Sequence, residues 1–174
     1  FRTAPPGEPD YQKIAVCAAL ANSFTVITGG PGTGKTTVVA ALLALELERD
    51  PELRIALCAP TGKAQARLHE SLLQDGAKLE LDDHPEIRRK LAELSTSTIH
   101  SLLRPDFETG GFRFNREHPL PCDLIVADEC SMIPLSLMTA LLEALKPDAR
   151  IVLLGDKDQL ASVESGAVLA DLCD

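Results

Sequence analysis

Four short apolar runs recur along the chain without alternating polar residues. They occupy residues 24–28, 55–59, 124–127 and 151–154. Runs of this length that are rich in Val, Ile and Leu are typical of strands buried on both faces. Between them, apolar residues recur at helical spacing, as at Val38, Leu42 and Leu45. The alternation predicts an α/β fold with a mostly parallel sheet, helices on both faces and ligands beyond the carboxyl ends of the strands.

The remaining segments fit this alternation of strands and helices less well. A charged helix is expected over 85–94 and a hairpin over 107–115, around two consecutive glycines. Residues 1–10 are rich in proline and begin without Met, so we expect a leader or linker in a piece cut from a longer protein. Residues 11–174 then form a single domain, which is an ordinary size for one core.

The strongest chemical signal follows the first apolar run. Residues 29–37 read GGPGTGKTT and fit the pattern G-x-x-x-x-G-K-[ST] between a strand and a helix. Such a loop turns backbone N–H groups toward phosphates, while Lys35 reaches the β- and γ-phosphates and the Thr36 hydroxyl binds Mg²⁺. The alternative is a glycine-rich turn with a surface lysine. We therefore expect ATP and Mg²⁺ to bind here. The nucleotide-binding candidates are Gly30, Pro31, Gly32, Thr33, Gly34, Lys35, Thr36 and Thr37.

Polar residues also follow the other apolar runs. Asp128 is expected to hold hydrated Mg²⁺, and Glu129 to orient and polarise the attacking water, unless both are solvated loop acids. Gln159 is placed to bind the γ-phosphate or that water. The turn over 59–64 offers N–H groups and a hydroxyl to a phosphate, with an ordinary strand-to-helix turn as the alternative.

Charge and composition restrict the kinds of partner that the protein can bind. Lys and Arg number 17 against 26 acidic residues, a net charge of −9, which argues against a surface that binds nucleic acid everywhere but leaves room for a local groove. The longest uncharged stretch, 14–34, is interrupted by polar residues and ends in the glycine loop, so no membrane helix is expected. Five cysteines without a C-x-x-C pair are interpreted as buried thiols in a reducing compartment.

Five segments together resemble the motifs I, Ia, Ib, II and III of superfamily 1 helicases. They are, in order, residues 29–37, 59–64, 97–103, 126–132 and 154–166. The likeness is greatest to the RecD type, the alpha subunit of exodeoxyribonuclease V or its free-standing relatives. The resemblance implies the first RecA-like domain of an ATP-driven motor that moves 5′ to 3′ on single-stranded DNA in bacterial recombination and repair. It also implies a cytoplasmic protein, with the other subunits of such a complex as further partners.

The resemblance adds further site residues. Gln12 stands where such helicases read the adenine edge, although a glutamine on an exposed helix surface is the alternative. Thr61, Lys63, Thr98 and His100 fall in segments that line the DNA, although His100 also fits a packed histidine at a helix start. The basic run 88–90 is interpreted as a solvated helix face.

The resemblance also implies a partner for catalysis. In such helicases a second RecA-like domain supplies arginines to the γ-phosphate, and this chain is expected to bind nucleotide but hydrolyse it poorly without that domain. Two other functions compete with the helicase motor. One is a phosphate-loop kinase on the same fold, and the other is a nucleotide-binding switch subunit without hydrolysis.

Overall fold

The computed structural model describes residues 9–156, 159 and 169, and in this part of the chain five parallel strands form one sheet. The strands are β1 (Phe24–Thr28), β2 (Ile55–Ala59), β3 (Thr96–Thr98), β4 (Leu124–Ala127) and β5 (Arg150–Gly155). They lie in the order β1-β5-β4-β2-β3. The parallel sheet is therefore confirmed, and the four predicted strands match β1, β2, β4 and β5.

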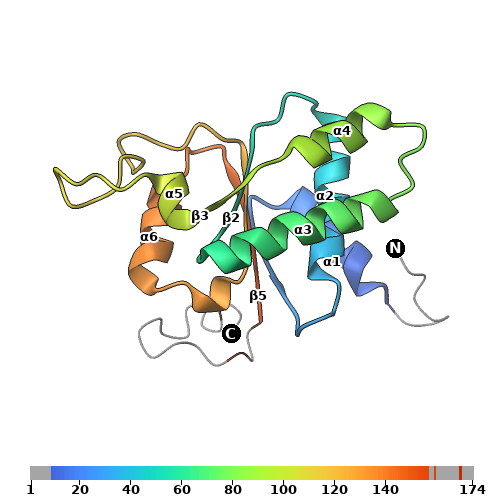
Figure 1. The fold of residues 1–174 in the computed structure, drawn as a ribbon, viewed down its shortest axis with the longest axis horizontal. Coiled ribbons are helices and arrows are strands. Elements are labelled where there is room, and N and C mark those ends of the chain that lie inside the picture. Colours follow the sequence, from blue (N-terminus) through green and yellow to red (C-terminus); the bar gives the residue numbers. More distant parts are fainter. Residues whose placement is uncertain (1–8, 157–158, 160–168, 170–174) are drawn as a thin grey trace.

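Helices cover both faces of the sheet, as expected (Figure 1). They are α1 (Tyr11–Ala21), α2 (Lys35–Arg49), α3 (Gly62–Lys78), α4 (Pro85–Glu93), α5 (Ile99–Leu103) and α6 (Leu135–Glu143), with the short 3₁₀ helix η1 (Cys130–Met132). Figure 1 shows α1 to α4 on one side of the sheet and α5 and α6 on the other.

The strands β2, β4 and β5 contribute alternate side chains to two separate cores. In β4, Leu124 and Val126 pack with α2 and α3, whereas Ile125 and Ala127 pack with α5 and α6. Because successive side chains of a strand point to opposite faces, a strand apolar at every position serves both cores. This two-sided burial is the physical reason for the uninterrupted apolar runs.

Two segments differ from the sequence prediction. The edge strand β3 was not predicted, because it is only three residues long and consists of Thr and Ser without an apolar run. The hairpin expected over 107–115 is reduced to one antiparallel bridge, between Pro105 and Phe112. Residues 1–8 lie outside the described part, so the proline-rich leader remains a prediction.

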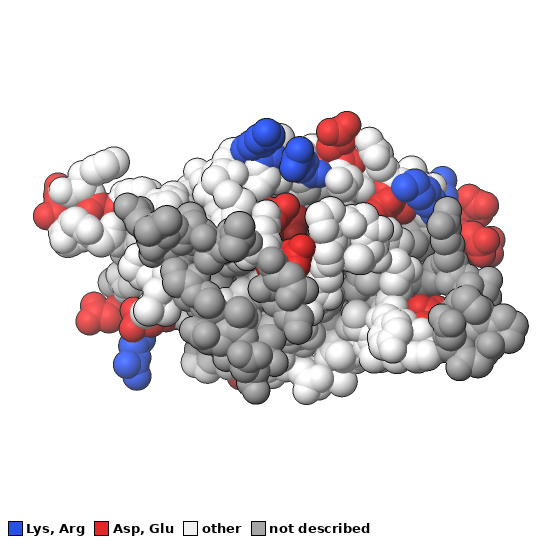
Figure 2. All heavy atoms as spheres, turned by 90° about the horizontal axis from the view of Figure 1, so that it is seen from below, with Lys and Arg blue, Asp and Glu red and all other residues white. Residues whose placement is uncertain are grey.

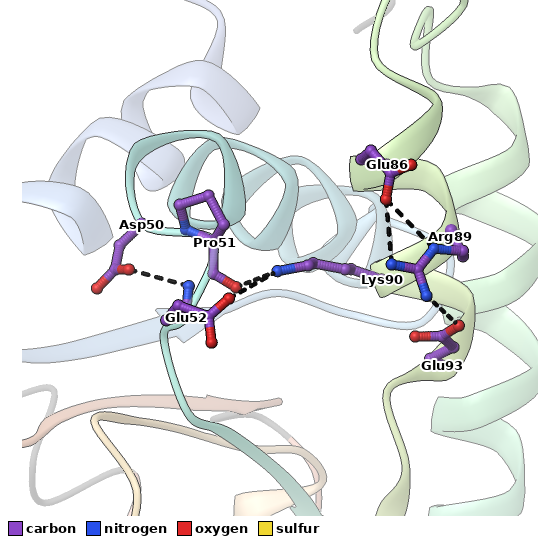
Figure 3. A network of polar contacts seen from close by, with 7 residues as sticks. All are labelled: Asp50, Pro51, Glu52, Glu86, Arg89, Lys90 and Glu93. Carbon is purple, nitrogen blue, oxygen red and sulfur yellow. Dashed lines mark hydrogen bonds and ion pairs between the residues drawn. The ribbon is translucent and has the colours of Figure 1, made fainter.

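The predicted charged helix is α4, and its basic residues are neutralised by nearby acids (Figure 3). Arg89 pairs with Glu86 at 3.1 Å and with Glu93 at 2.8 Å. Lys90 donates to the Pro51 carbonyl in the turn after α2 and lies 3.5 Å from Glu52. The ends of these side chains are engaged with the protein itself, which favours the solvated-face interpretation over a DNA patch.

The amino ends of the central strands are held by ion pairs. Asp123, just before β4, accepts from Arg54 at 3.0 Å and also pairs with Lys146. These two cations hold the pKa of the Asp123 carboxyl well below its usual range. Arg150, at the start of β5, forms a two-pronged pair with Glu46 of α2, which is 2% exposed. The amino ends of the strands are thus held by ion pairs, and the carboxyl ends carry the candidate site.

The cysteine prediction is confirmed at three positions and wrong at one, and Cys173 lies outside the described residues. Cys58, Cys122 and Cys130 are buried, and burial raises the pKa of the Cys58 thiol to about 12 and that of Cys122 to about 11. Cys17 is exposed, because it lies on the outer face of α1 rather than in the core. In the described part of the chain, no helix has the length and apolar character needed to cross a membrane.

Candidate nucleotide site

The glycine loop leads from the end of β1 into the start of α2. Gly32 and Gly34 have φ values of 75° and 88°, the left-handed region that glycine adopts without strain. A Cβ at Gly29 would lie 2.6 Å from the Thr33 hydroxyl. The Lys35 ammonium donates to the carbonyls of Gly29 at 2.5 Å and Gly30 at 3.1 Å. The loop thus closes around its own lysine at the helix N-terminus.

Gln12 of α1 is in contact with the glycine loop. Its side-chain amide donates to the Thr33 carbonyl at 3.3 Å. The approach is so close that a Cβ at Gly34 would lie 2.2 Å from Gln12 Nε2. A side chain at position 34 would displace the Gln12 amide, and the positive φ of Gly34 favours glycine there in any case. Gln12 is therefore placed beside the phosphate loop, and its predicted reading of adenine remains a prediction.

Two acids follow β4 at the same edge of the sheet. The Asp128 backbone N–H donates to the Cys58 carbonyl at 2.9 Å, which continues the pairing with β2. The Asp128 carboxylate accepts from the Glu129 N–H at 2.8 Å, and Glu129 has a φ of 53°, an uncommon backbone conformation for a side chain of this size. Burial raises the pKa of Asp128, and the neighbouring Glu129 carboxylate acts in the same direction.

The loop and the two acids line a common cleft of about 360 Å³. Of the predicted nucleotide residues, those that line it are Pro31, Gly32, Thr33, Gly34, Lys35 and Thr36, together with Asp128 and Glu129. Gly30 contributes its carbonyl to Lys35, and the Thr37 hydroxyl is directed to Asp75. The cleft therefore brings a lysine and a threonine of the glycine loop together with two acidic residues that lie far from them in the sequence.

The opposite wall of the cleft belongs to α3 and was not predicted from the sequence. Its lining residues are Arg67, Leu68, Ser71, Gln74 and Asp75. Their spacing places them on one face of the helix, with polar residues beside the buried Leu68. A polar stripe next to an apolar one was the available signal. It could not identify the cleft, because the wall depends on how α3 packs against α2.

Gln159 is held near the acidic segment by a side-chain contact. Its amide oxygen accepts from the Ser131 hydroxyl at 2.8 Å, two residues after Glu129. Its own backbone N–H donates to the Asp156 carbonyl at 3.2 Å. The Gln159 amide nitrogen, which can only donate, is the group left for a phosphate oxygen or a water.

The four predicted DNA residues lie at the carboxyl ends of β2 and β3. These strands are neighbours, with Ala59 opposite Thr98. Thr61 caps α3 by accepting from the Ala64 N–H, and Thr98 caps α5 by accepting from Ser101. Lys63 is exposed in the first turn of α3. The fold therefore gathers these segments beside the cleft, although none of the four residues lines it.

His100 is exposed rather than packed in a core. Its ring centroid lies 5.9 Å from that of Phe112, in a tilted arrangement. On the face drawn in Figure 2, Lys and Arg side chains lie in separate small groups with acidic side chains between and beside them. On this face the described residues form no broad basic surface of the kind that binds a nucleic-acid backbone, in agreement with the net charge of −9.

Sequence comparisons connect this geometry to known proteins. The AAA domain family profile matches residues 12–165. The protein named RecBCD enzyme subunit RecD from Mycolicibacterium smegmatis is 52% identical over 169 residues, covering 94% of this chain and 30% of that relative. Its namesake from Haemophilus influenzae is 46% identical, over 94% of this chain and 26% of the relative. The ATP-dependent RecD2 DNA helicase of Deinococcus radiodurans is 36% identical, covering 98% of this chain and 21% of that relative. The chain thus spans less than a third of these relatives.

Solved structures share the fold at low sequence identity. The UvsW helicase of bacteriophage T4 has a TM-score of 0.60 at 15% identity, covering 94% of this chain and 56% of that one. Pif1 of a Bacteroides species has a TM-score of 0.51 at 20% identity, covering 94% and 36%. The predicted RecA-like arrangement of a parallel sheet between helices is confirmed.

Proposed function

The chain belongs to the AAA domain family and is of the RecD type, and from this we propose that it forms an ATP-binding motor domain of a DNA helicase. The motor would hydrolyse ATP to move along single-stranded DNA in recombination and repair. The observation that carries the proposal is the shared cleft of Lys35, Thr36, Asp128 and Glu129. Each comes from the edge of the sheet at which ligands bind in open α/β folds.

The donor set of the cleft fits ATP with Mg²⁺. The Thr36 hydroxyl and the Asp128 carboxylate are hard oxygen donors of the kind that Mg²⁺ prefers beside phosphates. When bound, Mg²⁺ would neutralise charge on the phosphates. Lys35 would exchange its two carbonyl contacts for phosphate oxygens, and the glycine loop would supply backbone N–H groups. Gln12, already against the loop, would read the base.

Hydrolysis is assigned to two further residues. Glu129 would orient and polarise the attacking water, since its carboxylate lines the cleft next to the proposed Mg²⁺ ligand Asp128. Gln159, anchored through its oxygen to Ser131, would donate from its amide nitrogen to the γ-phosphate or the water. Arginines from a second motor domain would complete the site, as in other phosphate-loop enzymes.

DNA would bind across the ends of β2 and β3, where Thr61, Lys63, Thr98 and His100 lie. Hydroxyls and N–H groups at helix starts suit contacts to the sugar-phosphate backbone, which carry no sequence information. Because relatives are named as subunits of a RecBCD enzyme, other subunits of such a complex are proposed partners. The buried thiols suit a reducing bacterial cytoplasm.

Replacing the proposed water-activating acid tests this function. In the whole protein, Glu129→Gln should lower DNA-stimulated ATP hydrolysis by about 100-fold or more, because loss of a general base costs that much. Unwinding should be lost, while a fluorescent ATP analogue binds within about threefold of wild type. Glu143→Gln, on the exposed side of α6, is the matched control.

The outcomes separate the competing functions. If Glu129→Gln hydrolyses ATP and unwinds DNA as well as the Glu143→Gln control, the assigned role is wrong. If the wild-type protein binds the analogue but hydrolyses no ATP with DNA present, the switch subunit replaces the motor. Transfer of the γ-phosphate to a small acceptor instead of water would identify a kinase.

A further inference from the structure

Two helices of the cleft are joined by a hydrogen bond that no motif accounts for. The hydroxyl of Thr37, in the first turn of α2, donates to Asp75 Oδ2 on α3 at 3.0 Å. The two residues are 38 positions apart in the sequence. Thr37 directly follows the proposed Mg²⁺ ligand Thr36, so this bond involves the helix start that the phosphates would approach.

The Asp75 carboxylate is held firmly in place. Its other oxygen, Oδ1, lies 2.6 Å from the Lys78 ammonium one turn later on α3. The Asp75 side chain is 14% exposed and lines the cleft. With one oxygen on Lys78 and the other on Thr37, the carboxylate is held in place and directed at α2.

A threonine hydroxyl has one hydrogen to donate. It can donate that hydrogen to Asp75 or to a phosphate oxygen, but not fully to both. We infer that Asp75 is a positioning residue. It accepts the hydrogen bond of the Thr37 hydroxyl in the nucleotide-free protein and loses that bond when a nucleoside triphosphate binds. This inference rests on the proposed function. The triphosphate thus competes with a carboxylate of α3 for a hydroxyl of α2.

This competition sets nucleotide affinity and loosens the tie between α2 and α3 on binding. The tie matters because α3 is capped by Thr61 and carries Lys63 in its first turn, and both belong to the proposed DNA segment. Both helices also contribute apolar residues to one core, and those side chains carry no group that a phosphate would bind. The Thr37–Asp75 bond is therefore the contact between them that a phosphate would displace.

A double-mutant cycle on nucleotide binding tests the inference. The measurement is titration of a fluorescent ATP analogue with Mg²⁺ into wild type, Asp75→Ala, Thr37→Val and the double variant. Asp75→Ala should tighten binding roughly tenfold, the size of a competing hydrogen bond to a charged group. In the Thr37→Val background the same change should tighten binding less than about twofold, because no hydroxyl is left to release.

Two controls exclude a general effect of charge or misfolding. Glu48→Ala removes one acid from the exposed side of α2, outside the cleft lining, and should change affinity less than about twofold. Asp75→Asn keeps the size and an acceptor oxygen and should tighten binding about threefold, between wild type and Asp75→Ala. Thermal unfolding confirms that each variant is folded.

The result that overturns the inference is specific. If Asp75→Ala tightens binding equally in both backgrounds, charge alone explains it. If Asp75→Ala tightens binding no more than Glu48→Ala, no competition exists. Failure of the proposed function looks different, because wild type would then bind no analogue and Lys35→Ala would bind equally little.

Discussion

At Asp128, burial and function act against each other. The carboxyl lies at the end of a buried strand with Glu129 beside it, and both features raise its pKa. A group whose pKa is raised on folding binds its proton more tightly in the folded state, so stability falls as pH rises above the usual Asp pKa. The charged carboxylate that a metal site needs thus lowers the stability of the protein when no ligand is bound.

Asp128→Asn should therefore stabilise the protein while abolishing the site. The free energy of unfolding at pH 7 should rise by about 0.5–1 kcal/mol, the usual scale for such relief. The gain should shrink as pH falls through the usual Asp pKa and vanish well below it, where the wild-type carboxyl is protonated in both the folded and the unfolded state. Urea denaturation at several pH values measures this, and a less stable Asn variant at pH 7 would refute the explanation. Mg²⁺-dependent nucleotide binding should be lost.

Ser131 positions the amide of Gln159, so we expect replacement of Ser131 to slow ATP hydrolysis. Ser131→Ala removes the donor to Gln159 Oε1 and lets the amide rotate. Hydrolysis of ATP should slow by about three- to tenfold, the value of one neutral hydrogen bond, with nucleotide affinity within about twofold. Ser136→Ala, exposed on α6, is the control. Identical rates for the two variants would mean that Gln159 needs no anchor.

At the scale of elements, the sequence determines most strands and the fold class because burial on both faces leaves a continuous apolar run. It misses β3, where a three-residue edge strand pairs through its backbone and needs no apolar side chain. The sequence identifies the glycine loop and Asp128-Glu129, because each is a run of consecutive residues that forms a recognisable pattern. It misses Arg67 and Asp75, whose place in the cleft arises only when α3 packs on α2.

The pair between α2 and β5 should be the most sensitive of the ion pairs to truncation. Arg150→Met leaves Glu46 charged, almost fully buried and unpaired, which should lower the free energy of unfolding by about 3 kcal/mol. Replacing both residues by Met should restore most of that loss. Arg89→Met, which breaks exposed pairs on α4, should cost less than about 0.5 kcal/mol. Equal losses for Arg150→Met and Arg89→Met in urea denaturation would contradict this.

At the scale of the whole molecule, the two edges of the sheet have different roles. The amino edge carries compact ion pairs that hold strands and helices together. The carboxyl edge carries the glycine loop, the acids and the proposed DNA segments, with a buried charge and backbone strain that stability alone would not select. β4, which leads into the proposed Mg²⁺ ligand Asp128, pairs with β2, which leads into the proposed DNA segment at Thr61, so the two proposed sites meet at the carboxyl ends of these two strands.

The most direct test of this account is the binding of a fluorescent ATP analogue with and without Mg²⁺. Wild-type protein and Lys90→Ala, which removes a lysine remote from the cleft, should both bind the analogue in a Mg²⁺-dependent manner. Lys35→Ala should bind at least about tenfold more weakly, because a charged hydrogen bond to phosphate is lost. If Lys35→Ala binds the analogue as tightly as wild type, the glycine loop is not a nucleotide site and the account fails.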